Sequence, residues 1–72
     1  MHLLVLTSAL RHGVTGASIG EALRRAVTVH DLGDALLVVG RTRGDELVEV
    51  GLRDVGRPVA FHAMRVRPDL VP

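Results

Sequence analysis

Residues 15–29 read TGASIGEALRRAVTV, and within this stretch the hydrophobic period changes from that of a helix to that of a strand. The first part carries one apolar stripe at spacings i, i+3, i+4 and i+7, formed by Ile19, Ala22, Leu23 and Ala26. Thr15 is a suitable helix N-cap, and Val14 and Ile19 have the spacing of a hydrophobic staple. From Val27 onward β-branched residues predict a strand. We therefore expect a helix that begins after Thr15 and leads directly into a sheet.

The segment before this helix predicts another helix, over residues 2–12. Its leucines recur at helical spacing, namely Leu3, Leu6 and Leu10. Gly13 follows two basic residues, at the point where a helix should stop. A strand over residues 3–6 is the alternative, because a short apolar run fits either structure.

Four short strands are expected after the second helix. They are predicted over residues 27–30, 35–41, 46–53 and 58–66, with turns at residues 31–34, 42–45 and 54–57. Connections this short force antiparallel neighbours, because a parallel pair needs a crossover of a dozen or more residues. The sequence thus predicts a single α+β domain over residues 1–72. Two N-terminal helices would pack on one face of a four-stranded antiparallel meander.

The faces of the predicted sheet differ in polarity. Alternation in the third strand directs Val48, Val50 and Leu52 toward the helices and Glu49 away from them. The second and fourth strands are apolar on both faces, which indicates that a partner covers the far side. Because 72 residues build only a thin core, we expect a homo-oligomer or a complex.

Composition excludes several classes of protein. Phe61 is the only aromatic residue, so stacking platforms of the RNA-recognition-motif and cold-shock type are ruled out. All nine basic residues are arginine, which favours phosphate or carboxylate partners, although a GC-rich genome explains the same bias. Without cysteine there is no disulfide framework or thiolate nucleophile, and nothing points outside the cytoplasm. No apolar run approaches the roughly 20 residues that cross a bilayer.

Standard catalytic motifs are missing from the sequence: there is no phosphate-binding loop, no HExxH and no nucleophile elbow. Four histidines remain, namely His2, His12, His30 and His62. Their spacing does not indicate a metal site, and we expect neither a metal nor another cofactor. His12 falls at the predicted end of the first helix, where capping the last carbonyls is its simplest role.

His62 lies in the last predicted strand and is followed by Arg65 and Arg67. Alternation directs both arginines to the opposite face, unless twist or a bulge near the strand end changes their facing. Imidazole beside guanidinium suits a ribonuclease. One group takes the 2′-hydroxyl proton, another protonates the leaving oxygen, and arginine stabilises the pentavalent phosphate.

Acidic residues flank the third predicted strand, namely Asp45, Glu46, Glu49 and Asp54. Paired carboxylates can perform hydrolysis, but turn formation and cross-strand pairing explain these four better. Their expected partners are the neighbouring arginines, namely Arg41, Arg43, Arg53 and Arg57.

Three short runs of sequence, spread over most of the chain between residues 11 and 67, resemble the BrnT-like toxins of bacterial type II toxin–antitoxin systems. Arg11-His12-Gly13-Val14-Thr15 stands before the second helix, as a basic residue, His, Gly and Val do in that family. Val39-Gly40-Arg41, followed by Leu47-Val48-Glu49-Val50, resembles the Gly-Arg pair that ends a strand there. Phe61-His62-Ala63-Met64-Arg65-Val66-Arg67 stands where relatives carry a Ser-Ala-Arg-Arg type run.

The resemblance implies a compact relative of the RelE/ParE fold. It also implies a metal-independent ribonuclease that inhibits translation in the cytoplasm and is neutralised by a ribbon-helix-helix antitoxin. The catalytic residues would be His62, Arg65 and His12, and the RNA-binding residues Arg41, Arg67 and Arg43. Because Lys and Tyr are missing, any activity rests on histidine and arginine.

A non-catalytic binding or homodimerisation module of the same fold is the alternative. Met64, at a position that is usually basic in the family, and the apolar sheet surfaces favour it. DNA binding is the poorer hypothesis, since the net charge is only +1 and no helix carries a dense basic stripe.

Overall fold

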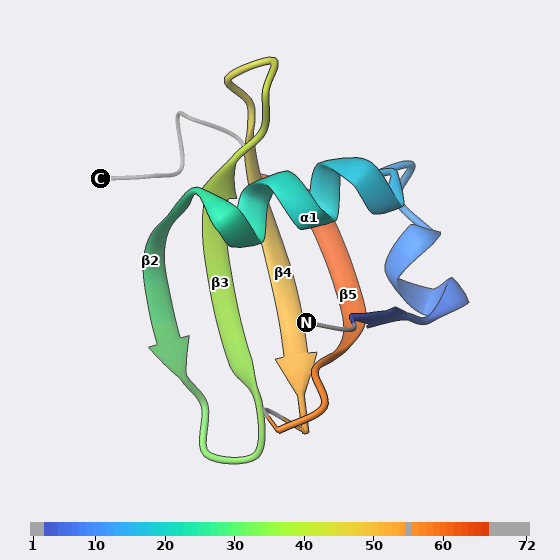
Figure 1. Cartoon of the computed structure of the whole chain (residues 1–72), viewed down its shortest axis with the longest axis vertical. Coiled ribbons are helices and arrows are strands. Elements are labelled where there is room, and N and C mark those ends of the chain that lie inside the picture. The colour runs from blue at the N-terminus through green and yellow to red at the C-terminus, as the bar shows by residue number, and fades with distance from the viewer. Residues whose placement is uncertain (1–2, 55, 67–72) are drawn as a thin grey trace.

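The computed structural model describes residues 3–54 and 56–66. In chain order its elements are β1 (Leu4–Val5), the 3-10 helix η1 (Thr7–Leu10), α1 (Gly16–Arg24), β2 (Ala26–Asp31), β3 (Leu36–Arg41), β4 (Leu47–Arg53) and β5 (Val59–Arg65). Figure 1 shows the strands side by side in one sheet, with α1 lying across one face. None of the helices in this part of the chain is long and apolar enough to cross a membrane.

The sheet is mixed and five-stranded, with the order β1-β5-β4-β3-β2. Strands β2 to β5 form an antiparallel meander, as the short connections predicted, and their bounds agree with the predicted strands to within two residues. The fifth strand, β1, pairs in parallel with β5 through Leu4 opposite Val59 and Val5 opposite Ala60. The long segment between β1 and β5 is the crossover that a parallel pair requires.

The prediction of a helix over residues 2–12 is wrong. The backbone N–H of Leu4 donates to the carbonyl of Pro58 at 3.1 Å, and that of Leu6 donates to the carbonyl of Ala60 at 3.0 Å. These bonds tie the segment to the edge of β5, so its backbone groups are satisfied by the sheet and only a short 3-10 turn follows. The predicted fold class, two helices on a four-stranded antiparallel sheet, is therefore replaced by one α-helix on a five-stranded mixed sheet.

Helix α1 begins where the sequence predicts. The hydroxyl oxygen of Thr15 accepts a hydrogen bond from the backbone N–H of Ser18 at 3.1 Å, and Val14 and Ile19 are both buried. The helix ends earlier than its apolar stripe suggested, because Ala26 already begins β2 and is exposed. The helix thus ends after Arg24, where the hydrophobic period changes from that of a helix to that of a strand.

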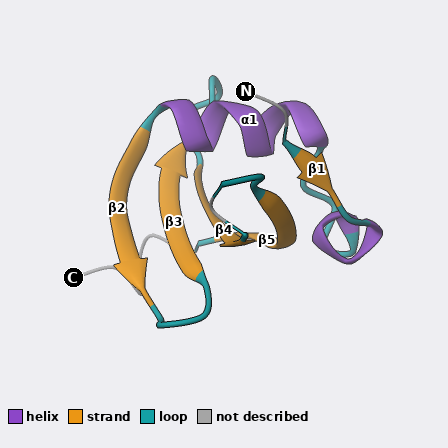
Figure 2. Ribbon diagram, turned by 60° about the horizontal axis from the view of Figure 1, so that its bottom comes forward, coloured by secondary structure: helices purple, strands orange, loops and turns teal. Residues whose placement is uncertain are grey.

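The core lies between α1 and the sheet. Its buried side chains are Ala9, Val14, Ile19, Ala22, Val48, Val50, Ala60 and Ala63. The alternation predicted for β4 is confirmed, since Val48 and Val50 are buried on the helix side. Figure 2 shows α1 on this face; across the described residues, no helix covers the opposite face, which we call the open face.

Candidate functional site

Two histidines from distant parts of the chain meet at β5. His62 lies within that strand, and His12 lies in the turn that follows η1. The hydroxyl of Ser8 in η1 donates to the carbonyl of Phe61 at 2.8 Å, which fixes η1 against β5. The imidazole ring centroids of His12 and His62 are 5.9 Å apart, with an angle of 71° between the ring planes.

A β-bulge at Phe61 sets the facing of His62. Gly51 pairs with His62 and Leu52 pairs with Ala60, so Phe61 is an extra residue on β5. A Cβ on Gly51 would stand 2.9 Å from Cζ of Phe61 and 3.1 Å from Cβ of His62. The missing side chain at Gly51 therefore makes room for both residues on the open face. Bulges commonly change the direction of side chains near functional sites.

Glu49 contacts His62 on the same face. The imidazole Nε2 of His62 lies 2.8 Å from Oε2 of Glu49, with side chains 31% and 28% exposed. A carboxylate oxygen only accepts, so Nε2 of His62 is the donor in this contact. In the neutral ring, the Nδ1 atom of His62 is then a hydrogen-bond acceptor.

Arg53 contacts Phe61, the residue that precedes His62 in β5. Its guanidinium carbon lies 5.1 Å from the centroid of the Phe61 ring, within the range of a cation–π contact. In the alternation of β4, Arg53 shares the open face with Glu49 and Gly51. We call the group formed by His12, Glu49, Arg53, Phe61 and His62 the histidine site.

Arg65, predicted to act beside His62, lies on the other face of the sheet. It pairs with Val48, which is buried under α1, and its Nε donates to Oε2 of Glu46 at 3.0 Å. Strand β5 is regular between His62 and Arg65, so the alternation that the sequence predicted for them is retained. The structure brings His12 to His62 but does not bring Arg65 to either.

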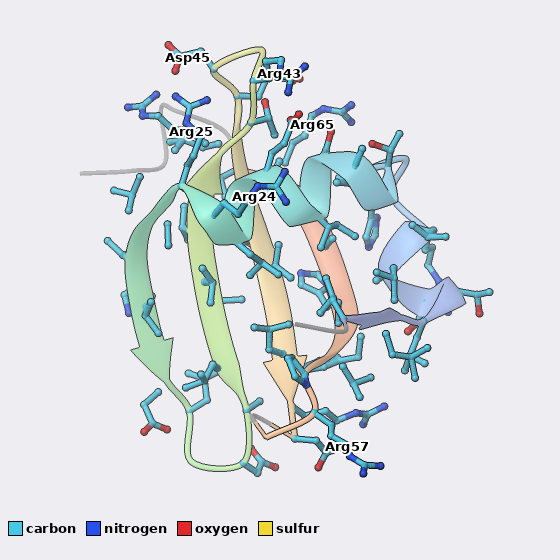
Figure 3. The ribbon with its side chains drawn as sticks, viewed as in Figure 1. Arg24, Arg25, Arg43, Asp45, Arg57 and Arg65 are labelled. Atoms are coloured by element: carbon cyan, nitrogen blue, oxygen red, sulfur yellow. The ribbon has the colours of Figure 1, made fainter. Side chains whose placement is uncertain are left out.

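Two of the predicted RNA-binding arginines, Arg41 and Arg43, lie around the turn between β3 and β4. Nη1 of Arg41 is 3.4 Å from Oδ1 of Asp45, and Nε of Arg43 is 3.6 Å from Oε2 of Glu21. Figure 3 shows Arg43 and Asp45 at this end of the molecule and Arg65 nearby. Arg67 lies outside the described residues.

Two further arginines that the sequence reasoning did not select join this end of the molecule. Arg24 and Arg25 follow each other at the end of α1, and Nη1 of Arg25 donates to the carbonyl of Thr42 at 2.8 Å. Across the described residues, neither has a carboxylate partner. The end of α1, the β3–β4 turn and the end of β5 together carry five arginines, which we call the arginine end, namely Arg24, Arg25, Arg41, Arg43 and Arg65. Three carboxylates, Glu21, Asp45 and Glu46, offset it only partly.

The acidic residues around β4 divide into two groups. Asp45 pairs with Arg41, as predicted, and Glu46 pairs with Arg65, which was not among the predicted partners. Glu49 pairs with His62 instead of an arginine. Asp54 begins the turn after β4 with a positive φ of 56°. The contact between Glu49 and His62 depends on the bulge, which no local sequence pattern signals. In the described residues, no three His, Cys, Asp or Glu side chains gather as ligands for a metal ion.

Comparison of the chain with protein-family models, with curated proteins and with solved structures finds no match.

Proposed function

We propose that this protein is a metal-independent ribonuclease in which His12 and His62 form the acid–base pair. The observation that carries the proposal is the 5.9 Å separation of the two imidazole rings. Each ring belongs to one of the runs that resemble the BrnT-like toxins, and the two runs lie at opposite ends of the chain. Two imidazoles this close can serve one phosphodiester, one as base and the other as acid.

In the proposed reaction His62 is the base. The contact of its Nε2 with Glu49 leaves Nδ1 to take the proton of the ribose 2′-hydroxyl. The 2′-oxygen attacks phosphorus, the bond to the 5′-oxygen breaks, and His12 protonates that oxygen. The products are a 2′,3′-cyclic phosphate and a 5′-hydroxyl, and every proton is accounted for without a metal ion.

Arg53 is proposed to stabilise the phosphate in this reaction. It is exposed on the same face as His62, and the face of the Phe61 ring beneath it limits its orientations. A guanidinium offers paired donors to the equatorial oxygens of a pentavalent phosphorus.

The arginine end is proposed to bind the RNA away from the cleaved bond. Its five arginines exceed its three carboxylates, and the side chain of Arg43 is 90% exposed. Arg65 lies at the end of β5 on the face opposite the histidine site, so in the proposal it holds a part of the RNA that is remote from the cleaved bond. Arg41 and Arg43 thus keep their predicted RNA-binding role in the proposal. Arg65, which was predicted to be catalytic, is reassigned to RNA binding, and proton transfer is assigned to the histidines.

The cellular role proposed from the resemblance is that of a type II toxin acting in the cytoplasm. RNA cleavage would inhibit translation, and a ribbon-helix-helix antitoxin would neutralise the protein.

The test is cleavage of a single-stranded RNA by the purified chain in excess EDTA. His12→Ala and His62→Ala should each lower the rate by about 100-fold or more, the contribution of general acid–base catalysis. His30→Ala is the matched control, because His30 is an exposed histidine on β2. It should cleave at the wild-type rate, and all variants should retain the wild-type melting temperature.

Wild-type chain that leaves RNA intact, or equal cleavage by all three variants, would remove the ribonuclease proposal. The second candidate function, a non-catalytic binding module, would then lead. The exposed strand β2 favours it, because its outer edge is free to pair within the described part of the protein.

A further inference from the structure

Strand β2 forms an open edge of the sheet. It is the last strand in the order, and all six of its residues are exposed (Figure 1). Val27 and Val29 are 56% and 58% exposed, although both are β-branched apolar residues of the kind that strands bury. Natural edges are usually protected by lysine, proline or a bulge. Here β2 contains no lysine or proline, and its bulge, at Val27 near the start of the strand, leaves residues 28–31 in regular register.

The hydrogen-bonding groups on this edge can be assigned from the turn that follows. The backbone N–H of Leu32 donates to the carbonyl of Ala35 at 2.8 Å, which makes these two residues a hydrogen-bonded pair. Hydrogen-bonded and non-hydrogen-bonded pairs alternate in an antiparallel ladder, so His30 bonds toward β3. Val29 and Asp31 then direct their N–H and C=O groups outward, where another strand can bond them.

The charges along β2 make the edge complementary to itself. Its beginning adjoins Arg24 and Arg25, and its end carries Asp31, with Asp34 in the turn beyond. An antiparallel copy reverses the direction of the strand. Each basic beginning therefore lies beside the acidic end of the other copy, whereas parallel pairing would align like charges.

The register of such a pair is also restricted. A two-fold axis at Val29 pairs the outward backbone groups of this residue with those of its own copy. It also brings the acidic end of each strand, formed by Asp31 and the following turn residue Asp34, beside the start of the partner's strand, which follows the basic end of α1. An axis at Asp31 would instead oppose two carboxylates, which is unfavourable directly across a ladder.

We propose that two copies of this chain associate through antiparallel pairing of β2 with β2 about Val29, which joins their sheets into one. The occupant of the edge is a second copy because β2 is complementary to an antiparallel copy of itself. The complementary features are its charged ends, its outward backbone groups and its exposed valines. The pairing does not require the ribonuclease function, since the histidine site lies at β5, three strands away.

The first test is the mass of the full chain in solution, measured by sedimentation equilibrium. Wild type should give twice the single-chain mass of 7.7 kDa. Val29→Lys should give the single-chain mass, because it sets two charges side by side at the axis. Leu4→Lys, at an equally exposed residue on β1, should stay dimeric. A single-chain wild type, or a dimeric Val29→Lys, would overturn the proposal.

Two further measurements separate this interface from any other. Amide exchange of Val29 and Asp31 in the wild type should slow as concentration rises, because their outward N–H groups gain partners only in the dimer. Asp34→Arg should weaken the dimer, and Arg24→Asp combined with Asp34→Arg should restore it. Amide exchange at Val29 and Asp31 that does not change with protein concentration would overturn the proposal. The edge would then be left for a partner protein of different sequence. A charge swap without rescue would overturn the register about Val29.

Discussion

Gly40 of β3 lies directly beneath Ala22 of α1, so closely that a Cβ on Gly40 would overlap the Ala22 carbonyl group and stand 2.9 Å from its Cα. Both residues are buried. The helix and the sheet therefore approach backbone to backbone at this point, which only glycine permits on the sheet side.

Gly40→Ala is accordingly predicted to destabilise the protein by about 3 kcal/mol, since the added methyl group must push α1 off the sheet. Chemical denaturation measures this. Gly56→Ala is the control, because a Cβ at Gly56 meets nothing within 4 Å. It should change stability by less than about 0.5 kcal/mol. Equal stability of the two variants would contradict the close approach of α1 to β3.

Val50→Ala is predicted to cost about 2 to 3 kcal/mol. Val50 is fully buried between α1 and the sheet and is among the largest side chains of a small core, so truncation leaves a cavity. Leu4→Ala removes more atoms but from a side chain that is 59% exposed, and should cost far less. Thermal unfolding of both variants compares them, and a larger loss for Leu4→Ala would contradict the observed core.

Thr15→Ala is predicted to cost about 1 kcal/mol, because the Thr15 hydroxyl is the only side chain that caps the start of α1 in the described structure. Thr7→Ala is a matched control: its residue begins η1, where no side-chain cap is formed. Circular dichroism during thermal unfolding should show a lower melting temperature for Thr15→Ala only. Identical melting of the two variants would mean that the cap contributes nothing to stability.

Sequence reasoning predicted the elements whose signals are local. The start of α1 is set by neighbouring positions, namely Thr15 and the staple of Val14 and Ile19. The β-branched residues after Arg24 likewise signal the beginning of the meander. The N-terminal segment carries no such signal. It becomes a strand because Pro58 and Ala60, far along the chain, accept its hydrogen bonds, and the leucine spacing suggested a helix instead.

The histidine site was predicted only in part for the same reason. Both histidines were selected from the sequence, but their meeting depends on the bulge at Phe61 and on the bond from Ser8 to the strand backbone. The contact between Glu49 and His62 depends on the same bulge. The residue type of Glu49 alone suggested only an arginine partner. Arg65 was grouped with His62 by proximity in sequence, whereas the regular strand between them directs the two side chains to opposite faces.

Arg65→Ala is predicted to weaken RNA binding and leave the cleavage step unchanged. KM should rise by about fivefold, equivalent to ~1 kcal/mol for one exposed charge contact, while kcat stays at the wild-type value. The slope of log affinity against log salt should fall by about 0.7, the value for one single-strand phosphate contact.

Arg57→Ala is the control for this experiment, because Arg57 lies at the opposite end of the molecule (Figure 3). Its KM should be unchanged. A large fall in kcat for Arg65→Ala would instead return Arg65 to the proton-transfer site.

Glu49→Gln is predicted to lower kcat by about tenfold or more and to leave KM unchanged. The amide keeps the shape of the carboxylate but can offer its NH2 group to His62, so Nε2 no longer has to be the donor and the ring loses its fixed tautomer. In the proposed reaction Glu49 is a positioning residue, and the separation of kcat from KM distinguishes this role from RNA binding. Single-turnover cleavage at saturating protein measures the step directly.

Glu46→Gln is the matched control, since Glu46 is an exposed acid that pairs with Arg65 at the arginine end. It should retain kcat, because it does not touch either histidine. A wild-type kcat for Glu49→Gln together with a lower melting temperature would assign Glu49 a structural role only. The base would then have to be sought in His12, whose ring stands against His62 but has no carboxylate partner in the described structure.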